Sequence, residues 1–470
     1  MLAVRRSLSC NYCILMEEGN MEIVTVRAVK ITHLHKSGSC IAATDKLYGE
    51  AVDFCVNAFE TMWSEIQTHG NGLDSHFMQN YLISLVHSAK GRTARFPEFD
   101  KRFYKMPQFM LQDVVTKAYG HLSSYHTQHD QWEKGGRNGS EPTLGSAKME
   151  TPTFYRKGYK QADDGTAMLK LYNGHDWVWV EVSVSGTDMR SLRKSLGNGK
   201  LSCPTLQKRH HGWVLVFAIK ERVQLPDAPE YGETVLAVDL GINTDAACSV
   251  IRSDGTVLAR EFVNFTSEKD HIMHMLNRVR RISREMGSSN THKVWEYTRH
   301  CNKEHAIHIA KAIVDIAVLY NVDCIVFEHL DTSGKKHGSK KQKLAMWNHQ
   351  TVQNVTATLA HKAKIRISHI CAWGTSKLAY DGSGTVLRGK NSTQTNGCYS
   401  ICEFQSGKVY NCDLNASYNI GARYFIRKLK SKLSPIWLDK LYQTYPESQH
   451  QTQCTLDTLR KAYAFSIMPA

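Results

Sequence analysis

The sequence predicts an α/β domain in the C-terminal half of the chain, preceded by a smaller β-domain that a helical segment interrupts. After residue 233, short apolar runs rich in β-branched residues alternate with helical stretches. Alternating runs typical of half-buried strands occur at 23–31 and again between 166 and 225. From 45 to 125, apolar residues recur every three or four positions, which is the period of an amphipathic helix.

The composition is that of a globular protein with an excess of positive charge. Of its 470 residues, 42% are hydrophobic, which is enough for several domains with apolar cores, and the formal net charge is +15. Such a charge favours a nucleic-acid partner, although a basic protein without one has the same balance. No run approaches the roughly 20 apolar residues that cross a bilayer, so we expect no membrane partner. Thirteen cysteines without a recognisable secretory signal are typical of a reducing cytoplasm.

In the first half of the chain, strand patterns lie on both sides of the helical pattern. The segment at 95–109 mixes aromatic with basic residues, which fits either core rings with solvated charges or a surface that stacks nucleotides. The linker that follows the helices is rich in glycine, serine, histidine and glutamine. The expected segments are an unstructured leader at 1–20, the first part of the β-domain at 21–44, a helical domain at 45–130, a linker at 131–150 and the second part of the β-domain at 151–230.

In the second half, the pattern predicts a sheet that begins with an antiparallel meander. Two apolar strands follow residue 233, and an Asp254-Gly255 turn leads into a third. A long helical stretch at 267–320 comes next, then further strands and helices. The expected segments are the α/β domain at 231–370 with a basic loop near 331–343, a polar insert at 371–412, a final helix at 413–430 and a C-terminal tail at 431–470.

Three acids occupy positions that call for an explanation. Asp239 lies inside the first apolar strand of the α/β domain, Glu328 ends a later strand and Asp413 begins the final helix. Each alone is more often a salt-bridged or helix-capping residue, since a buried acid needs a partner. Together, in this order, they fit an RNase H-like nuclease that holds two Mg²⁺ or Mn²⁺ ions on carboxylate oxygens. Asn411 and Asn415 would either orient Asp413 or cap the helix locally.

The stretches around the three acids resemble a known family. "AVDLGINTDAACSV", "IVFEHL" and "NCDLNASYNIGARYF" are similar to the three RuvC motifs of transposon-encoded TnpB proteins and their descendants, the type V CRISPR effectors. "GTSKLAYDGSG" resembles a segment before the third motif in compact members. The resemblance is strongest over 230–430; upstream only the layout agrees. It implies an RNase H-like RuvC domain plus a β-barrel-like wedge domain with an inserted helical recognition domain.

The family resemblance also implies an activity. It is RNA-guided DNA cleavage, in which a guide RNA of transposon or CRISPR origin pairs with double-stranded target DNA beside a short motif that the protein reads. A single RuvC site with two metal ions on Asp239, Glu328 and Asp413 would then cut the DNA. The resemblance further implies a prokaryotic, cytoplasmic protein that associates with the nucleoid when on DNA, as a monomer or homodimer.

Two alternatives from other classes stay open at the level of sequence. The first is an RNA-guided DNA-binding repressor that has lost cutting, although the presence of all three carboxylates favours the nuclease. The second is a RuvC-like resolvase or transposase, which would need neither a guide RNA nor an inserted helical domain. RNA that copurifies with the protein would separate the last possibility from the other two.

Two basic groups are candidate nucleic-acid contacts. In the family, a lid covers the active site just after the second motif, which here is the basic loop; a solvated charged connector is the competing interpretation. The arginines lie on the long helical stretch that precedes this motif. The candidates are Arg278, Arg280 and Arg281 in the helical stretch, and Lys335, Lys336, Lys340, Lys341 and Lys343 in the loop.

Cysteines between the second and third motifs bear on a structural zinc ion. Many relatives carry a zinc ribbon there, made of two Cys-x-x-Cys pairs. This chain offers Cys371, Cys398, Cys402 and Cys412, whose spacing does not match two short knuckles. We therefore expect a degenerate ribbon that keeps its shape by packing, without zinc.

Overall fold

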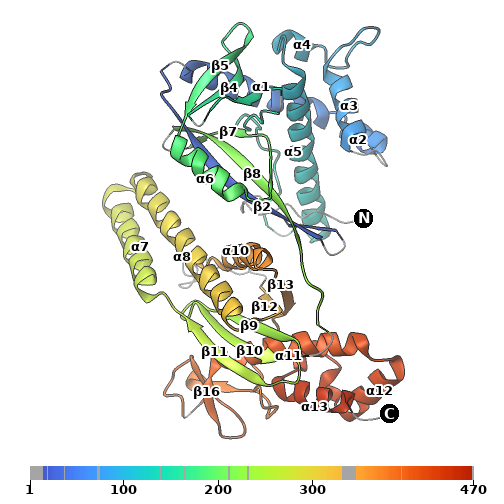
Figure 1. Ribbon diagram of the computed structural model, residues 1–470, viewed down its shortest axis with the longest axis vertical. Coiled ribbons are helices and arrows are strands. Elements are labelled where there is room, and N and C mark those ends of the chain that lie inside the picture. Colours follow the sequence, from blue (N-terminus) through green and yellow to red (C-terminus); the bar gives the residue numbers. More distant parts are fainter. Residues whose placement is uncertain are drawn as a thin grey trace. The chain divides into compact units, whose positions relative to one another are not determined.

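The computed structural model describes residues 14–17 and 20–467, apart from 36, 71–74, 138, 156, 164, 210–211, 230–231, 331–345 and 393. The chain divides into two compact units, shown with their helices and strands in Figure 1. One unit is Val24–Glu221, and the other combines Met1–Ile23 with Arg222–Ala470. The mixed α/β character predicted from the sequence is confirmed, and no described helix is long and apolar enough to cross a membrane.

An eight-stranded sheet joins the early strand to the later ones, as the sequence predicts. Its order is β3-β4-β5-β2-β8-β6, with β1 paired to β2 and β7 paired to β8. The early strand β2 thus lies between β5 and β8, so the helical segment is an insertion within the sheet. Part of the expected leader is a strand, because Ile14 pairs with Ile23 in an antiparallel register. The strands are β1 (Ile14–Glu17), β2 (Asn20–Thr32), β3 (Tyr159–Gln161), β4 (Thr166–Tyr172), β5 (Trp177–Val184), β6 (Lys200–Leu201), β7 (Thr205–Arg209) and β8 (Gly212–Gln224).

The helical insertion shares one apolar core with this sheet. Tyr48 and Phe59 of α1 and Val114 of α5 are fully buried in the same cluster as Leu169 and Phe217 of the sheet. The wedge and recognition segments, predicted as separate domains, therefore pack as one unit. Helix α5 also extends past the predicted end of the helical domain, into the first residues of the expected linker. The helices are α1 (Gly38–Glu60), α2 (Trp63–Gly70), α3 (Ser75–Val86), α4 (Glu98–Arg102), α5 (Gln108–Lys134) and α6 (Gly186–Leu196).

The aromatic residues at 95–109 belong mainly to the core. Phe99, Phe103 and Phe109 are at most 5% exposed, whereas Tyr104 is 68% exposed. Phe99 and Phe103 pack against Phe54 of α1. The segment is therefore packed core with charges at its surface.

A five-stranded sheet organises the other unit, with the predicted meander at one edge. Its order is β11-β10-β9-β12-β13, in which β9, β10 and β11 are antiparallel and β12 runs parallel to both β9 and β13. The strands are β9 (Thr234–Leu240), β10 (Ala246–Arg252), β11 (Val257–Val263), β12 (Cys324–His329) and β13 (Arg366–Cys371).

Helices cover both faces of this sheet. Helices α8 and α10 bury one face, α7 packs against α8, and α11 with α13 buries the other face. The helical stretch predicted at 267–320 is two helices, because α7 ends at Gly287, whose φ of +84° suits glycine. The helices are α7 (Thr266–Met286), α8 (His292–Leu319), α10 (His349–Lys362), α11 (Cys412–Lys432), α12 (Pro435–Thr444) and α13 (Leu456–Ser466).

The expected C-terminal tail is folded, which corrects the prediction. Leu441, Leu456 and Leu459 are fully buried, and α13 packs on α11. Thr455 caps α13 through a reciprocal capping box with Thr458. These few apolar residues are separated by polar ones, which hid the helices in the sequence. The polar insert before α11 holds a small sheet of β14 (Leu387–Arg388), β15 (Ile401–Glu403) and β16 (Val409–Asn411).

Candidate functional site

Two of the three candidate acids lie on neighbouring strands at the same level of the sheet. Val238 of β9 pairs in parallel register with Phe327 of β12, and Asp239 and Glu328 are the next residues along each strand. The register therefore sets Asp239 and Glu328 side by side, near the carboxyl ends of both strands.

Both acids face the helix α11. Side chains alternate along a strand, so Asp239 shares a face with Ala237, and Glu328 shares a face with Val326. Ala237 and Val326 belong to the apolar cluster that α11 buries. The two carboxylates thus continue the α11 face of the sheet at the point where its apolar surface ends.

The third acid begins the helix that covers this face. Asn411 caps α11, and its side-chain oxygen accepts the backbone N–H groups of Asp413 at 2.9 Å and Leu414 at 3.0 Å. Asn411 therefore orients the helical turn that carries Asp413. Asn415 is fully buried and binds elsewhere: its amide donates to Leu378 and accepts from the backbone of Tyr380, both 2.8 Å. It holds the segment 374–384 against α11.

A glycine lets α11 approach the sheet closely. A Cβ atom at Gly421 would lie 2.6 Å from Cδ1 of Ile251 and 3.2 Å from Cβ of Ala237. Only glycine fits this contact without movement of a neighbour. The contact helps to set the distance between the helix that carries Asp413 and the strand that carries Asp239.

The three carboxylates have raised pKa values because they are removed from water and face one another. Burial raises the pKa of Asp239 well above its usual range, and the charges of Glu328 and Asp413 raise it further. Burial also raises the pKa of Glu328 and of Asp413. Repulsion between negative charges in one site disfavours ionisation of all three carboxyl groups, and a nearby cation weakens that repulsion.

Several groups partly offset this accumulation of negative charge. The Thr375 hydroxyl and Arg423 lower the pKa of Glu328, and the Thr244 hydroxyl and Arg388 lower that of Asp413. None of these four was identified from the sequence. Arg423 alone gave a signal, as a charged residue within the otherwise apolar run "NIGARYFI".

Arg423 is fully buried and joins three segments of the chain. Its guanidinium donates to the carbonyl oxygens of Cys371 and Trp373 after β13, at 2.9 and 2.8 Å. It also donates to those of Thr452 and Cys454 before α13, at 2.8 and 3.3 Å. The side chain therefore holds α11, the end of β13 and the C-terminal segment together beside Glu328.

The donor set suits a hard divalent cation. Glu328 is 8% exposed, and its Oε1 is buried without a hydrogen-bond partner among the described residues. A buried carboxylate oxygen in this state is what Mg²⁺ or Mn²⁺ would satisfy. The ligand atoms of Asp239, Glu328 and Asp413 do not all lie within 4.8 Å of one another.

The four cysteines do not gather at one point. Cys402 and Cys412 are buried with their thiols hydrogen-bonded, which lowers the pKa of Cys412, while Cys371 and Cys398 are exposed. Among the described residues, no three of these sulfur atoms lie within 4.8 Å of one another. The expected absence of zinc stays a prediction.

The candidate nucleic-acid contacts have two outcomes. Arg278, Arg280 and Arg281 are exposed on α7, where Arg280 donates to Asn277 at 3.0 Å. The lysines of the basic loop, Lys335, Lys336, Lys340, Lys341 and Lys343, lie outside the described residues. Contact of either group with nucleic acid stays a prediction.

Comparison with known proteins finds one family model and a similar protein. Residues 25–173 match the model of the Aq_aa04 family. The TnpB-like protein aq_aa05 of Aquifex aeolicus (strain VF5) is 24% identical over 259 residues, which cover 49% of this chain and 80% of that protein.

Two solved structures are also similar in part. The Cas12f1–sgRNA–target DNA complex gives a TM-score of 0.48 at 13% identity, covering 81% of this chain and 81% of that one. CasPhi-2 (Cas12j) bound to crRNA and phosphorothioate DNA gives 0.42 at 9% identity, covering 84% and 90%. The chain is thus similar to this TnpB-like protein over about half of its own length.

Proposed function

We propose that this protein is an RNA-guided DNA endonuclease in which Asp239, Glu328 and Asp413 hold two Mg²⁺ or Mn²⁺ ions. The observation that carries the proposal is the juxtaposition of Asp239 and Glu328 on adjacent strands, facing the helix that Asp413 begins. The order of the sheet, three antiparallel strands followed by two parallel ones, supports an RNase H-like nuclease domain. The guide RNA is inferred from the family, and the net charge of +15 suits two nucleic-acid partners.

The residues around the carboxylates prepare them for metal. When bound, the ions would supply an activated water and charge stabilisation for the leaving oxygen of the phosphodiester. The hydroxyl groups of Thr375 and Thr244 lower the pKa values of Glu328 and Asp413, and the positive charge of Arg388 lowers that of Asp413 further. Since the pKa values of all three carboxyl groups are raised, protons compete with metal for them, and we expect metal affinity to fall as the pH is lowered.

We further propose a division of labour between the two units. The unit Val24–Glu221 would act as wedge and recognition domains for the guide RNA and the target-adjacent motif, and the other unit would cut. Arg278, Arg280 and Arg281, together with the loop lysines, would contact phosphates. The protein would work in the cytoplasm of a prokaryote, on the nucleoid, as a monomer or homodimer.

The test begins with the RNA that copurifies with the protein. Sequencing of that RNA should yield one defined species, and the complex should then cut a plasmid carrying its complement in Mg²⁺ or Mn²⁺ but not in EDTA. Asp239→Asn, Glu328→Gln and Asp413→Asn should each abolish cutting and leave guided DNA binding intact, because base pairing and basic residues hold the DNA.

Each contrary outcome has a distinct meaning. Guided binding without cutting by the wild-type protein would replace the endonuclease with a DNA-binding repressor. Cutting without any bound RNA would replace it with a resolvase or transposase. Retained cutting by one variant would remove that residue from the metal site.

A further inference from the structure

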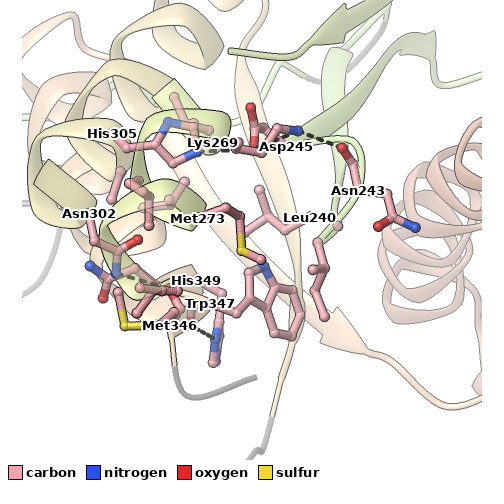
Figure 2. Close-up of a pocket in the computed structure, with 18 residues that line it drawn as sticks. Leu240, Asn243, Asp245, Lys269, Met273, Asn302, His305, Met346, Trp347 and His349 are labelled. Carbon is pink, nitrogen blue, oxygen red and sulfur yellow. Dashed lines mark hydrogen bonds and ion pairs between the residues drawn. The ribbon is translucent and has the colours of Figure 1, made fainter. Parts of the chain in front are cut away.

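A cavity of about 160 Å³ lies beside the carboxylate site, on the opposite face of the sheet. The turn after β9, the helices α7 and α8, and the chain entering α10 enclose it. Figure 2 shows His305, Lys269 and Asp245 at one end, Trp347 and Met346 at the other, and Met273 and Leu240 between them.

The size and lining of the cavity suit one aromatic ring. Apolar side chains form most of its walls, and the indole of Trp347 provides a flat surface. A cavity of about 150 Å³ with apolar walls is known to take up benzene in another protein. The apolar lining consists of Leu240, Ile242, Ile272, Met273, Leu276, Ala306, Ile309, Met346, Trp347 and Val352.

The cavity lies next to a second pocket, a surface groove that contains Asp413. That groove is lined by Thr244, Tyr399 and Asp413. It also shares Trp347 and the turn at 240–243 with the cavity. Tyr399 is 64% exposed. A DNA strand with a phosphate at Asp413 would therefore carry a neighbouring base past Trp347, at the entrance to the cavity.

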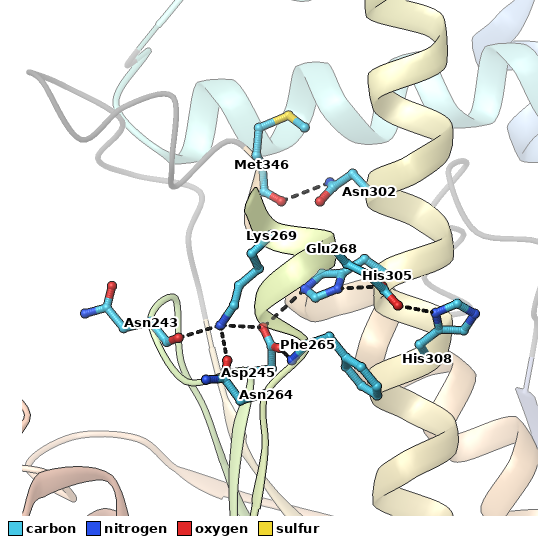
Figure 3. Close-up of polar contacts among 10 residues, drawn as sticks. All are labelled: Asn243, Asp245, Asn264, Phe265, Glu268, Lys269, Asn302, His305, His308 and Met346. Atoms are coloured by element: carbon cyan, nitrogen blue, oxygen red, sulfur yellow. Dashed lines mark hydrogen bonds and ion pairs between the residues drawn. The ribbon is translucent and has the colours of Figure 1, made fainter. Parts of the chain in front are cut away.

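A polar network joins residues at the far end of the cavity, as Figure 3 shows. Asp245 accepts the backbone N–H of Phe265 at 2.8 Å, and its other carboxylate oxygen lies 3.2 Å from Nε2 of His305. The other ring nitrogen of His305 lies 3.0 Å from Glu268. Lys269 donates to the backbone oxygen of Asn243 at 2.5 Å and lies 3.4 Å from Asp245. The turn after β9 is thereby tied to α7 and α8.

One polar side chain in the lining can pair with a base edge. The amide of Asn302 donates one N–H to the backbone oxygen of Met346 at 2.9 Å. A carboxamide has two N–H groups and an oxygen, so a donor and an acceptor remain beyond this bond. Enzymes that bind unpaired bases combine such an edge contact with stacking between aromatic and apolar side chains.

We propose that this cavity, here called the base pocket, receives one unpaired pyrimidine of the DNA strand that is being cut. The inference rests on the proposed function and adds a substrate subsite to it. A pyrimidine has a single ring, which matches the volume, whereas a purine has two. Insertion of the base would fix the position of the neighbouring phosphate at the carboxylates.

The test replaces one nucleotide at a time around the cut with an abasic analogue. With the wild-type protein–guide complex, we expect one position where loss of the base slows cutting about 5- to 150-fold, the range expected for loss of a base stacked on an aromatic side chain. At the same position, a purine should be cut more slowly than a pyrimidine. Guided DNA binding should not change.

Variants of the pocket connect this effect to the cavity. Ala306→Leu fills the cavity from α8, and Trp347→Ala removes the stacking surface without adding bulk. Each variant should cut the intact substrate at the rate at which the wild type cuts the abasic substrate. Removal of the base should not lower the cleavage rate of either variant further. Trp437→Ala, a matched control for a half-buried tryptophan in α12, should behave as wild type.

The outcomes separate the pocket from the endonuclease. If the wild-type complex cuts but no position is sensitive to loss of its base, the pocket is overturned and the endonuclease stands. The same holds if the Ala306→Leu and Trp347→Ala variants remain sensitive to loss of the base. If the wild-type complex does not cut, the endonuclease fails, and the pocket is judged by binding of a labelled single-stranded oligothymidine. Weaker binding by both variants, with Trp437→Ala unchanged, would then support the pocket, and equal binding would overturn it.

Discussion

Substitution of Gly421 by alanine tests whether the close approach of α11 to the sheet sets the geometry of the proposed carboxylate site. The new methyl group would lie 2.6 Å from Ile251 Cδ1, and Ile251 is fully buried. Overpacking of this kind costs about 1–3 kcal/mol of unfolding free energy. In a helix interior, alanine is more favourable than glycine by up to about 1 kcal/mol of unfolding free energy. The overpacking term is the larger, so we expect a net loss of about 1 kcal/mol, or a fall in melting temperature of about 2–4 °C.

The assay combines thermal melting with cleavage, and a second substitution tests the cause. We expect Gly421→Ala to cut more slowly, because the new methyl group pushes α11, and with it Asp413, away from Asp239. Ile251→Val removes the clashing methyl and alone costs about 0.5–1.5 kcal/mol. In the double variant, cleavage and melting temperature should recover relative to Gly421→Ala, with a coupling energy of about 1 kcal/mol. A Gly421→Ala protein that is as stable and active as wild type, or additive effects of the two substitutions, would refute the reasoning.

Three further predictions concern other parts of the structure. The carboxylates of Asp245 and Glu268 outweigh the effect of burial and raise the pKa of His305, so the stabilisation from its positive charge is fully present below about pH 6.5 and is lost as the pH rises through the raised pKa. The difference in melting temperature between wild type and His305→Gln should therefore shrink from pH 6 to pH 9. A difference that stays constant over this range would contradict the prediction. Replacement of the five loop lysines by alanine should slow cleavage and flatten its salt dependence by roughly one counterion for each lost phosphate contact; an unchanged slope would make the loop a connector. Elemental analysis should find less than about one equivalent of zinc, and the Cys398→Ser, Cys402→Ser double variant should fold and cut, since the cysteine spacing lacks the two-residue knuckles of a zinc ribbon. Stoichiometric zinc with an unfolded variant would restore the ribbon.

The sequence could predict features that depend on local periodicity. Asp239 stood out because it interrupts an apolar run. Since successive side chains of a strand point to opposite faces of the sheet, its position in β9 also implies which face its side chain takes. The placement of the early strand in the same sheet as the later strands followed from its pattern, and the pairing of β2 with β5 agrees with it. These features need only a few neighbouring residues, so a single chain carries them.

Features that arise from packing between distant segments could not be predicted. Thr375 and Arg423 act on Glu328 from positions 47 and 95 residues away in the chain. Nothing in their immediate neighbours indicates that contact. The sequence did not indicate α12 and α13 for a related reason. Each buries only a few apolar side chains, and its stability comes from packing against other helices rather than from a clear amphipathic pattern of its own.

The contacts of Arg423 have a consequence for how cutting can be lost during evolution. The guanidinium binds carbonyl groups at 452 and 454, so the fold around Asp413 depends on residues that are synthesised late. A premature stop codon before α11 would remove Asp413 and the cover of one sheet face, yet leave every residue of the Val24–Glu221 unit encoded. A single nucleotide change can therefore remove Asp413 while the Val24–Glu221 unit is still encoded, and under the proposed function a descendant that binds DNA without cutting it needs no change at Asp239 or Glu328.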